Sequence, residues 1–524
     1  MSQLRTRQNV YKLGSAWADP ILWYARGVQK LKERPLADRT SWTFYGGIHG
    51  IFRALWDFYG ITDPNEPGPS QADTDTFIDQ CQHQSFFFLP WHRGYLMAIE
   101  TLIRSEIEAL GGPHESWALP YWNYFGDGQN ALPPEFRSPD WPDGTGDNPL
   151  FVVQRWGPMG GTQPFDIASR TNLDPLGDPV FTGPGGGVST GFGGPATGFN
   201  WQGGSSGGLE MNPHNIVHGL VGGGSPTDTF SDGTPLPGLM STPTAAALDP
   251  IFYLHHCNID RLWQSWNVFP AGKPSAAPTD WQNPNNLDWL QGPARSGERR
   301  FVMPKPDGSE WVYTPTEMQK IDALGYEYDD LTPGAAVQGM DMAARRAVLG
   351  IAAAARGGPA VAASSSEMMG ASDKGLALSG SGATRTTVRT DAAVRGRVSN
   401  SLAGRAATAP DRVFLNLENI TGLYDAVIFE VYVGLAADAD DATRQAHLAG
   451  NVSLFGVRQA SDMAGRHSGG GINATLEITG IVDKLHLAGN FDADELSVEI
   501  VPMDEIPEAA QIRIGRISLY RQFE

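Results

Sequence analysis

Two histidines lie four residues apart in the segment Leu209-Glu210-Met211-Asn212-Pro213-His214-Asn215-Ile216-Val217-His218-Gly219. In a helix, residues at this spacing share one face, with Cβ atoms about 6 Å apart. Two imidazoles placed in this way can bind one metal ion through ring nitrogens. Pro213 suits the first turn of such a helix, and Gly219 suits its end. Paired helical histidines also occur on surfaces and in cores, so a metal site here requires further ligands from elsewhere in the chain.

The composition describes a large globular protein of 524 residues, 41% of them hydrophobic, with a net charge of −20. This acidity disfavours nucleic acid or an anionic membrane as a partner. No apolar run reaches the roughly 18 residues of a membrane span, and the first twenty residues lack a secretory signal. Cys81 and Cys257 are too few for a disulfide framework. We therefore expect a cytoplasmic protein, with export in complex with another protein left open.

Composition divides the chain into three expected regions. Residues 1–335, rich in Trp, Phe and Pro, predict one large domain with helices over about Asp19–Lys32 and Pro90–Ala109. Residues 336–410 are rich in Ala, Gly, Ser and Thr, which is typical of an exposed, protease-sensitive linker. Residues 411–524 contain short β-type runs whose spacing predicts a sandwich: Val413–Leu417, Val427–Val433, Ala474–Ile478, Leu496–Val501 and Gln511–Tyr520.

The glycine-rich stretch 183–208 belongs to the first domain. No strand precedes it and no phosphate-binding lysine follows it, so it does not predict a nucleotide site. We expect a surface covering with little regular structure.

Seven of the eleven histidines lie in four clusters, which are His49, His83/His92, His214/His218 and His255/His256. Adjacent histidines on a helix point about 100° apart, so one of the last pair can bind metal while the other supports it. Imidazoles without thiolate or carboxylate partners suit copper, zinc, iron or nickel. Two three-histidine sites would use six of the seven residues. The residue types therefore predict a dinuclear histidine site whose metal stays open.

Asp260 and Arg261 follow the last cluster, either as a buried ion pair that orients the site or as a solvated pair.

The segments around these histidines resemble those of the tyrosinase and polyphenol oxidase family, which are type 3 copper proteins. The matching motifs are Gly47-Ile48-His49-Gly50, Cys81-Gln82-His83, Pro90-Trp91-His92-Arg93, Pro213-His214-Asn215-Ile216-Val217-His218, and Asp249-Pro250-Ile251-Phe252 with His255-His256-Cys257-Asn258-Ile259-Asp260-Arg261. The resemblance implies two copper ions, CuA bound by His49, His83 and His92, and CuB bound by His214, His218 and His256. It extends to Tyr326-Glu327-Tyr328, with which Arg7 is expected to pair. The implied fold is a mainly α catalytic domain, a four-helix bundle around the coppers, followed by an all-β sandwich.

The resemblance also implies a chemistry. Family members use O2 to hydroxylate monophenols at the ortho position and to oxidise o-diphenols to o-quinones. Glu210 and Asn215 match a pair that polarises a water molecule, which would help to deprotonate a monophenol of pKa near 10. Cys81 matches a cysteine that forms a thioether with His83, although a buried free thiol is the alternative. Phe88 matches an aromatic residue packed on that histidine, and Pro243 is the expected substrate gate.

The last region, around Phe429-Glu430-Val431-Tyr432-Val433, resembles the domain that shields the copper site of latent plant-type polyphenol oxidases until the linker is cut. It implies a latent enzyme with an activating protease, and Phe455 and Phe491 are candidates for the side chain that plugs the site. The expected substrates are small phenols and O2. Three alternatives remain open: a catechol oxidase without monophenolase activity, a haemocyanin-like O2 carrier, and a zinc hydrolase.

Overall fold

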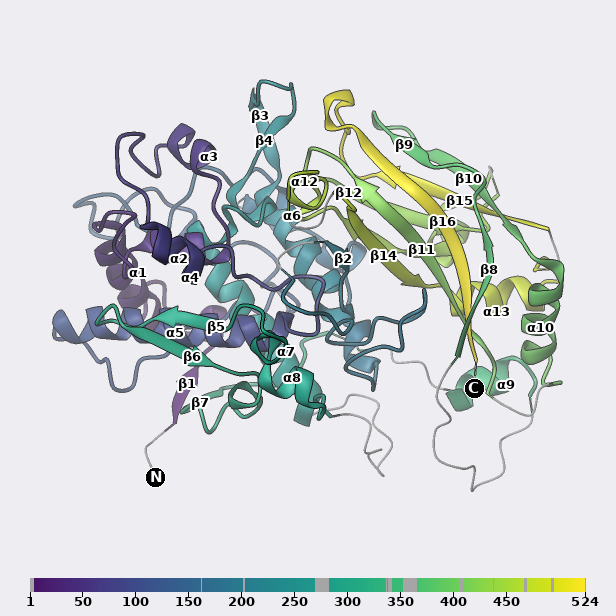
Figure 1. Ribbon diagram of the computed structural model, residues 1–524, viewed down its shortest axis with the longest axis horizontal. Coiled ribbons are helices and arrows are strands. Elements are labelled where there is room, and N and C mark those ends of the chain that lie inside the picture. The colour runs from purple at the N-terminus through teal and green to yellow at the C-terminus, as the bar shows by residue number, and fades with distance from the viewer. Residues whose placement is uncertain are drawn as a thin grey trace.

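The structure is a computed structural model that describes residues 4–161, 163–200, 203–268, 282–335, 337, 342–351, 365–405, 409–436, 438–465, 469–491 and 494–523. Its buried apolar side chains form two cores, one drawn mainly from residues 10–328 and the other from residues 369–519. Figure 1 shows the corresponding parts, a helical domain on the left and a β domain on the right. Ile428 and Phe455 come from the second domain in sequence but are buried in the core of the first.

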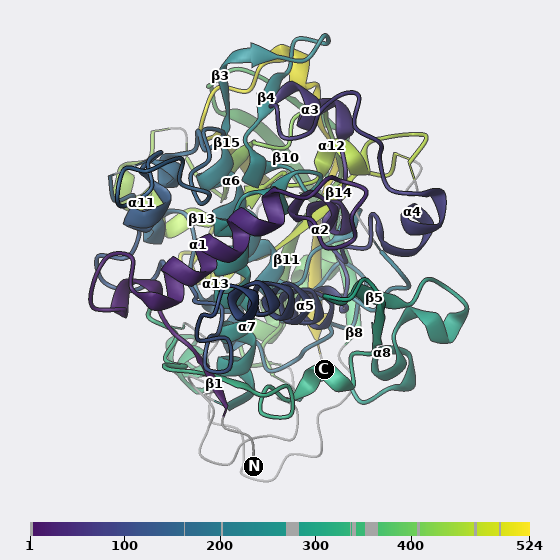
Figure 2. The same cartoon turned by 90° about the vertical axis from the view of Figure 1, so that its left-hand side faces the viewer.

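Four helices at the centre of the first domain form the expected bundle, and each carries or adjoins a predicted copper ligand: α2 (Trp42–His49), α5 (Phe88–Ala109), α6 (Ile216–Gly222) and α7 (Ile251–Val268). The predicted helix α1 (Asp19–Lys32) packs against α5 with an apolar face. In Figure 2, α1, α2, α5 and α7 lie in front of the β domain. Shorter elements surround the bundle: α3 (Arg53–Phe58), α4 (Gln71–Phe77), α8 (Leu287–Gln291), β3 (Gly224–Thr229) paired with β4 (Pro235–Pro237), and β5 (Phe301–Pro304) paired with β6 (Glu310–Tyr313).

The segment that contains His214 differs from the expected regular helix. An irregular helical turn spans Glu210–Asn215, with Asn212 in a non-helical conformation and a cis peptide bond before Pro213. Regular helix α6 begins only at Ile216. The expected end at Gly219 is wrong, because the helix continues to Gly222 and ends at Gly223, whose positive φ suits a glycine.

A buried ion cluster ties the chain's first strand to the bundle. Strand β1 (Arg5–Arg7) pairs in parallel with β7 (Tyr326–Tyr328), as the expected Arg7–tyrosine pairing requires. The Asp260 carboxylate accepts hydrogen bonds from Arg93, from Arg7 at 3.2 Å and from the Tyr328 hydroxyl. The expected pairing of Asp260 with Arg261 is wrong, since Arg261 donates to backbone carbonyls between residues 330 and 333.

The second domain is built on a ten-stranded sheet whose hydrogen-bonded path runs β13-β12-β15-β10-β8-β16-β11-β14-β2, with β9 beside β16 and with β2 supplied by the glycine-rich stretch of the first domain. Strands β13 and β14 lie near opposite ends of this path and still contact each other, so the sheet curls around its core. The strands are β2 (Gly204–Ser205), β8 (Ser365–Ala371), β9 (Leu376–Leu378), β10 (Thr384–Thr390), β11 (Arg412–Thr421), β12 (Ile428–Val433), β13 (Leu448–Ser453), β14 (Ile472–Glu477), β15 (Glu495–Pro502) and β16 (Ile512–Phe523). The β domain thus contains all five predicted runs, and it adds helices α11 (Asp441–His447), α12 (Val457–Ala460) and α13 (Thr479–Leu487).

The linker expected over residues 336–410 is wrong for much of its length. Residues 365–390 contribute strands β8, β9 and β10, and α10 (Ala392–Leu402) follows with the Asp391 side chain as its N-cap. The sequence does not predict these elements because strands such as Thr384–Thr390 are low in hydrophobic residues and bury few side chains. Residues 352–364 of the expected linker lie outside the described part. Helix α9 (Met342–Val348) is bound to α13 by Arg345, which makes a bidentate ion pair with Asp483.

Within the residues that the structure describes, no helix is both long and apolar enough to cross a membrane.

Candidate metal centre

Three imidazole nitrogens converge at the predicted CuB site. The Nε2 atoms of His214, His218 and His256 lie 3.1, 3.2 and 3.4 Å from one another. The Nδ1 atom of His218 donates to the Met240 carbonyl at 2.7 Å, and Nδ1 of His214 donates to Asn215 Oδ1 at 2.8 Å. Because a carbonyl oxygen only accepts, these rings direct unprotonated Nε2 atoms at their neighbours. An ion about 2 Å from each of three such nitrogens fits this triangle.

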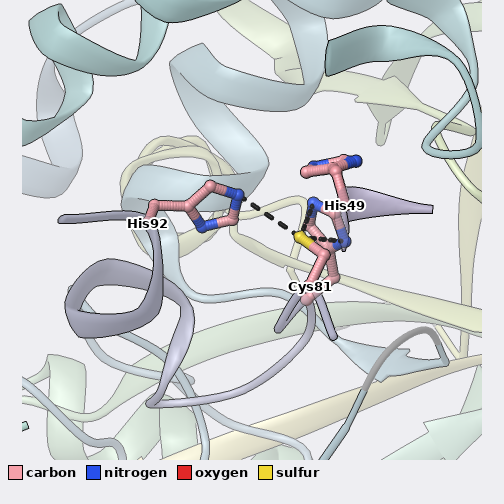
Figure 3. A group of neighbouring side chains, drawn as sticks. His49, Cys81 and His92 are labelled. Atoms are coloured by element: carbon pink, nitrogen blue, oxygen red, sulfur yellow. Dashed lines mark hydrogen bonds between the residues drawn. The ribbon is translucent and has the colours of Figure 1, made fainter. Parts of the chain in front are cut away.

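The predicted CuA ligands form a second buried group. The candidate ligand atoms of His49, Cys81, His83 and His92 all lie within 4.8 Å of one another. Nδ1 of His49 donates to the Pro243 carbonyl at 2.7 Å, and Nδ1 of His92 donates to the Phe88 carbonyl at 2.8 Å. Figure 3 shows the Cys81 sulfur beside the His92 ring, to which a dashed line joins it, with His49 nearby.

The electrostatics suit metal binding, which requires neutral imidazole. Burial lowers the pKa of His49 to about 4 and that of His214 to about 3, and it lowers the pKa of His92, His218 and His256 well below the usual value. At neutral pH these rings present lone pairs to one another, and a bound cation removes that repulsion. The donor set of each triplet therefore fits a metal ion.

The two triplets face each other. The rings of His92 and His256 stack with centroids 4.4 Å apart, and those of His83 and His214 are 5.8 Å apart. Phe88 lies between the triplets, closer to His92 (4.5 Å) and His214 (4.7 Å) than to His83 (6.0 Å), the histidine on which it was expected to pack. Segments from across the first domain thus form one centre for two ions.

His255 lies beside this centre. The third nitrogen of the CuB triangle comes from the next residue, His256. The His255 ring stacks on His214 with centroids 5.4 Å apart, whereas Nε2 of His256 approaches both His214 and His218. The candidate ligand atoms of His214, His218, His255 and His256 all lie within 4.8 Å of one another, so the choice of His256 as the ligand and His255 as a supporting residue stays a prediction.

Cys81 is buried and lies against the His83 ring. Its sulfur is 3.5 Å from Nδ1 and 3.6 Å from Nε2 of His83, and 3.3 Å from Nε2 of His92. Near-equal distances to the two ring nitrogens of His83 suit a bond to Cε1, the carbon between them.

The carboxylate of Glu210 is buried, and both of its oxygens accept a hydrogen bond from the Gln84 backbone N–H, at 2.8 and 3.0 Å. Burial outweighs these bonds and raises the pKa of Glu210 to about 8. Asn215, whose side-chain oxygen accepts from His214, donates its amide N–H to the Ser206 hydroxyl at 3.4 Å. Sequence reasoning missed Gln84 and Ser206, since neither lies in a periodic pattern or a ligand-like spacing.

Pro243 contributes its carbonyl, which holds His49, while the Met240 carbonyl three residues earlier holds His218. One loop therefore orients a ligand of each triplet. The role of Pro243 as a substrate gate stays a prediction.

Phe455 extends from the second domain to the metal centre. Its ring stacks on His218 with centroids 4.3 Å apart, and it makes edge contacts with His83 at 5.5 Å and His214 at 5.8 Å. The side chain is 1% exposed. Phe491, the other candidate plug, is buried in the core of the second domain instead.

A helical bundle with two facing histidine triplets, covered by a β domain, defines a protein with a dinuclear metal centre. A family model described as the common central domain of tyrosinase matches residues 39–184 and 186–268, and one described as a domain of unknown function matches residues 365–522. The tyrosinase HcTyr1 of Hahella sp. (strain CCB-MM4) is 30% identical, across 99% of this chain and 100% of that protein. The chloroplastic polyphenol oxidase A1 of Vicia faba is 28% identical, across 63% of this chain and 48% of that protein. The solved structure of latent apple tyrosinase shares the fold with a TM-score of 0.57 at 19% identity, over 99% of this chain and 97% of that one.

The chain belongs to the tyrosinase family. It is an oxidoreductase whose cofactor is a pair of copper ions and whose co-substrate is O2. This assignment settles the metal that the residue types alone left open, and it excludes the zinc hydrolase.

Proposed function

We propose that the protein is a latent phenol oxidase with both monophenolase and diphenolase activity. One monophenol and one O2 give one o-quinone and one water, and two o-diphenols and one O2 give two o-quinones and two waters. When bound, the copper pair supplies the activation of O2 and takes up the electrons of the phenol. The observation that carries the monophenolase assignment is the buried carboxylate of Glu210 in the turn that carries His214, together with Asn215, whose side chain bonds to that histidine.

The protein must remove a proton from a monophenol, because a free phenol with a pKa near 10 is almost entirely neutral at pH 7. Burial alone raises the pKa of Glu210 to about 8, which favours its neutral form, and the positive charge of two bound copper ions nearby would favour the ionised form that can take up this proton. The oxygens of Glu210 and Asn215 that already accept one hydrogen bond each keep a further lone pair for a water molecule. A water held by both would accept the phenol proton and pass it to Glu210.

Phe455 supports latency, since an aromatic ring against His83, His214 and His218 occupies the space that a substrate ring would need beside the ligands. Removal of the second domain would withdraw that ring. Strand β8, which begins at Ser365, belongs to the second domain, and Arg345 binds α9 to α13 of the same domain. We therefore place the activating cut before Met342 or between Ile351 and Ser365. A protease is then the expected activating partner.

Glu210→Gln in the cleaved protein tests the assignment. The amide keeps the shape of the carboxylate but cannot take a proton, so we expect oxidation of tyramine to fall by roughly 100-fold or more while catechol oxidation changes much less. A cleaved wild-type protein that oxidises catechol but not tyramine would instead be a catechol oxidase. Protein that binds O2 and oxidises neither would be an O2 carrier.

A further inference from the structure

Asn200, in the glycine-rich stretch, is hydrogen-bonded to the chain segment that carries His83. Its side-chain amide donates to the carbonyl oxygens of His83 at 2.8 Å, Gln84 at 3.2 Å and Gly203 at 2.9 Å. Its backbone N–H donates to Gln82 Oε1 at 2.9 Å, and its own carbonyl accepts from the His83 N–H at 3.1 Å. Asn200 is 8% exposed, so water does not replace these bonds easily.

The segment that Asn200 holds has no regular structure of its own. His49, His92, His218 and His256 lie on helices, whereas His83 lies in chain without regular structure, followed by Gln84 at a φ of +48°. A non-glycine residue in this conformation needs surrounding contacts to hold it.

The same segment also positions the proposed base. The Gln84 N–H donates to both oxygens of Glu210, and Gln84 Oε1 accepts from the Gly203 N–H at 2.9 Å. A displacement of residues 83 and 84 would therefore move a CuA ligand and the Glu210 carboxylate together.

We infer that Asn200 is a positioning residue of the metal centre, which fixes the backbone of His83 in the CuA site and, through Gln84, the orientation of Glu210. Its effect on copper rests only on the histidine triplets. Its effect on Glu210 rests on the proposed function, so the test measures copper binding, which does not depend on that function.

The experiment compares Asn200→Ala and Asn200→Asp with the control variant Asn148→Asp. All three are made in the full chain, because β14 of the second domain pairs with Gly204 and Ser205 in the glycine-rich stretch that contains Asn200. Asn148 is a matched control, because it is 4% exposed and its amide donates to two backbone carbonyls, of Glu135 and Ser138. The readouts are bound copper per chain, copper affinity, the electron paramagnetic resonance spectrum and the melting temperature. Two coupled Cu(II) ions give no resonance signal, whereas a lone Cu(II) ion does.

We expect both Asn200 variants to bind CuA roughly 10–100-fold more weakly and to show the signal of a lone ion, as when a residue supporting a metal ligand is lost. The Asn148 variant should melt earlier yet keep two silent coppers. The inference would be overturned if the Asn200 variants bound two copper ions with unchanged affinity and gave no resonance signal. An equal loss of copper in the Asn148 variant would also overturn it. If neither Asn200 variant folds, Gln82→Leu removes one bond of the same set, and unchanged copper binding in that variant would overturn the inference equally.

Discussion

Replacement of Phe455 by alanine in the uncut chain should expose the copper site without proteolysis. The ring is fully buried between the domains, with its centroid 4.3 Å from that of His218. Truncation of a buried phenylalanine costs about 3–5 kcal/mol. Because this ring packs in the core of the first domain while its backbone belongs to the second, the loss falls mainly on the docked arrangement. At 1.4 kcal/mol per factor of ten, the open fraction should rise by roughly two to three and a half orders of magnitude.

The assay is catechol oxidation by the uncut protein, with and without later proteolysis. Phe491→Ala is the matched control, since it removes the same side chain from the core of the second domain and leaves Phe455 in place. We expect the Phe455 variant to be active before cleavage and to gain little from it. An uncut Phe455 variant as inactive as the wild type, or a Phe491 variant equally activated, would refute this role for the ring.

Three further predictions concern other buried groups. Burial raises the pKa of Asp425 from 3.8 to about 6, so the folded state binds this proton more tightly than the unfolded state and loses stability as pH rises from 4 to 6. Asp425→Asn, which cannot titrate, should therefore gain roughly 2 kcal/mol relative to the wild type between pH 4 and pH 7, measured by urea unfolding; a constant difference would contradict this. Asp260→Asn leaves the buried Arg93 without its carboxylate partner and Arg7 with Glu100 alone, and it should cost about 3–5 kcal/mol of unfolding free energy, whereas a loss below 1 kcal/mol would show that the cluster is dispensable. If Cys81 forms the thioether with His83, copper-loaded wild-type protein should weigh two hydrogens less than its sequence, with O2 as the oxidant, and Cys81→Ser should have its full sequence mass.

Local patterns in the sequence were sufficient for the elements with strong periodicity. The apolar spacing of Asp19–Lys32 predicts α1 with its observed bounds, and short runs of β-type residues predict β11, β12, β14, β15 and β16. The histidines were found because each lies in a short motif. Strands within 365–390 were missed because exposed Thr, Ser and Arg dominate them, and only a few side chains such as Met369 and Val388 are buried.

Interactions between distant segments could not be predicted. Asp260 pairs with Arg93 and Arg7, which are 167 and 253 residues away, so its neighbour Arg261 was a misleading choice. Asn200 and Ser206 lie in a glycine-rich stretch whose composition indicates only irregular chain. Sequence reasoning identified Phe455 only as one of two candidates, because the contact of its ring with the histidines depends on how the domains dock.

The most direct test of the account is the copper content of the loaded full chain and of three single variants. We predict two copper ions per chain in the wild type and in His255→Asn, and one in His92→Asn and in His256→Asn. A loaded wild type with one copper or none would contradict the facing triplets. A His255 variant that loses an ion while the His256 variant keeps both would contradict the assignment of the last ligand.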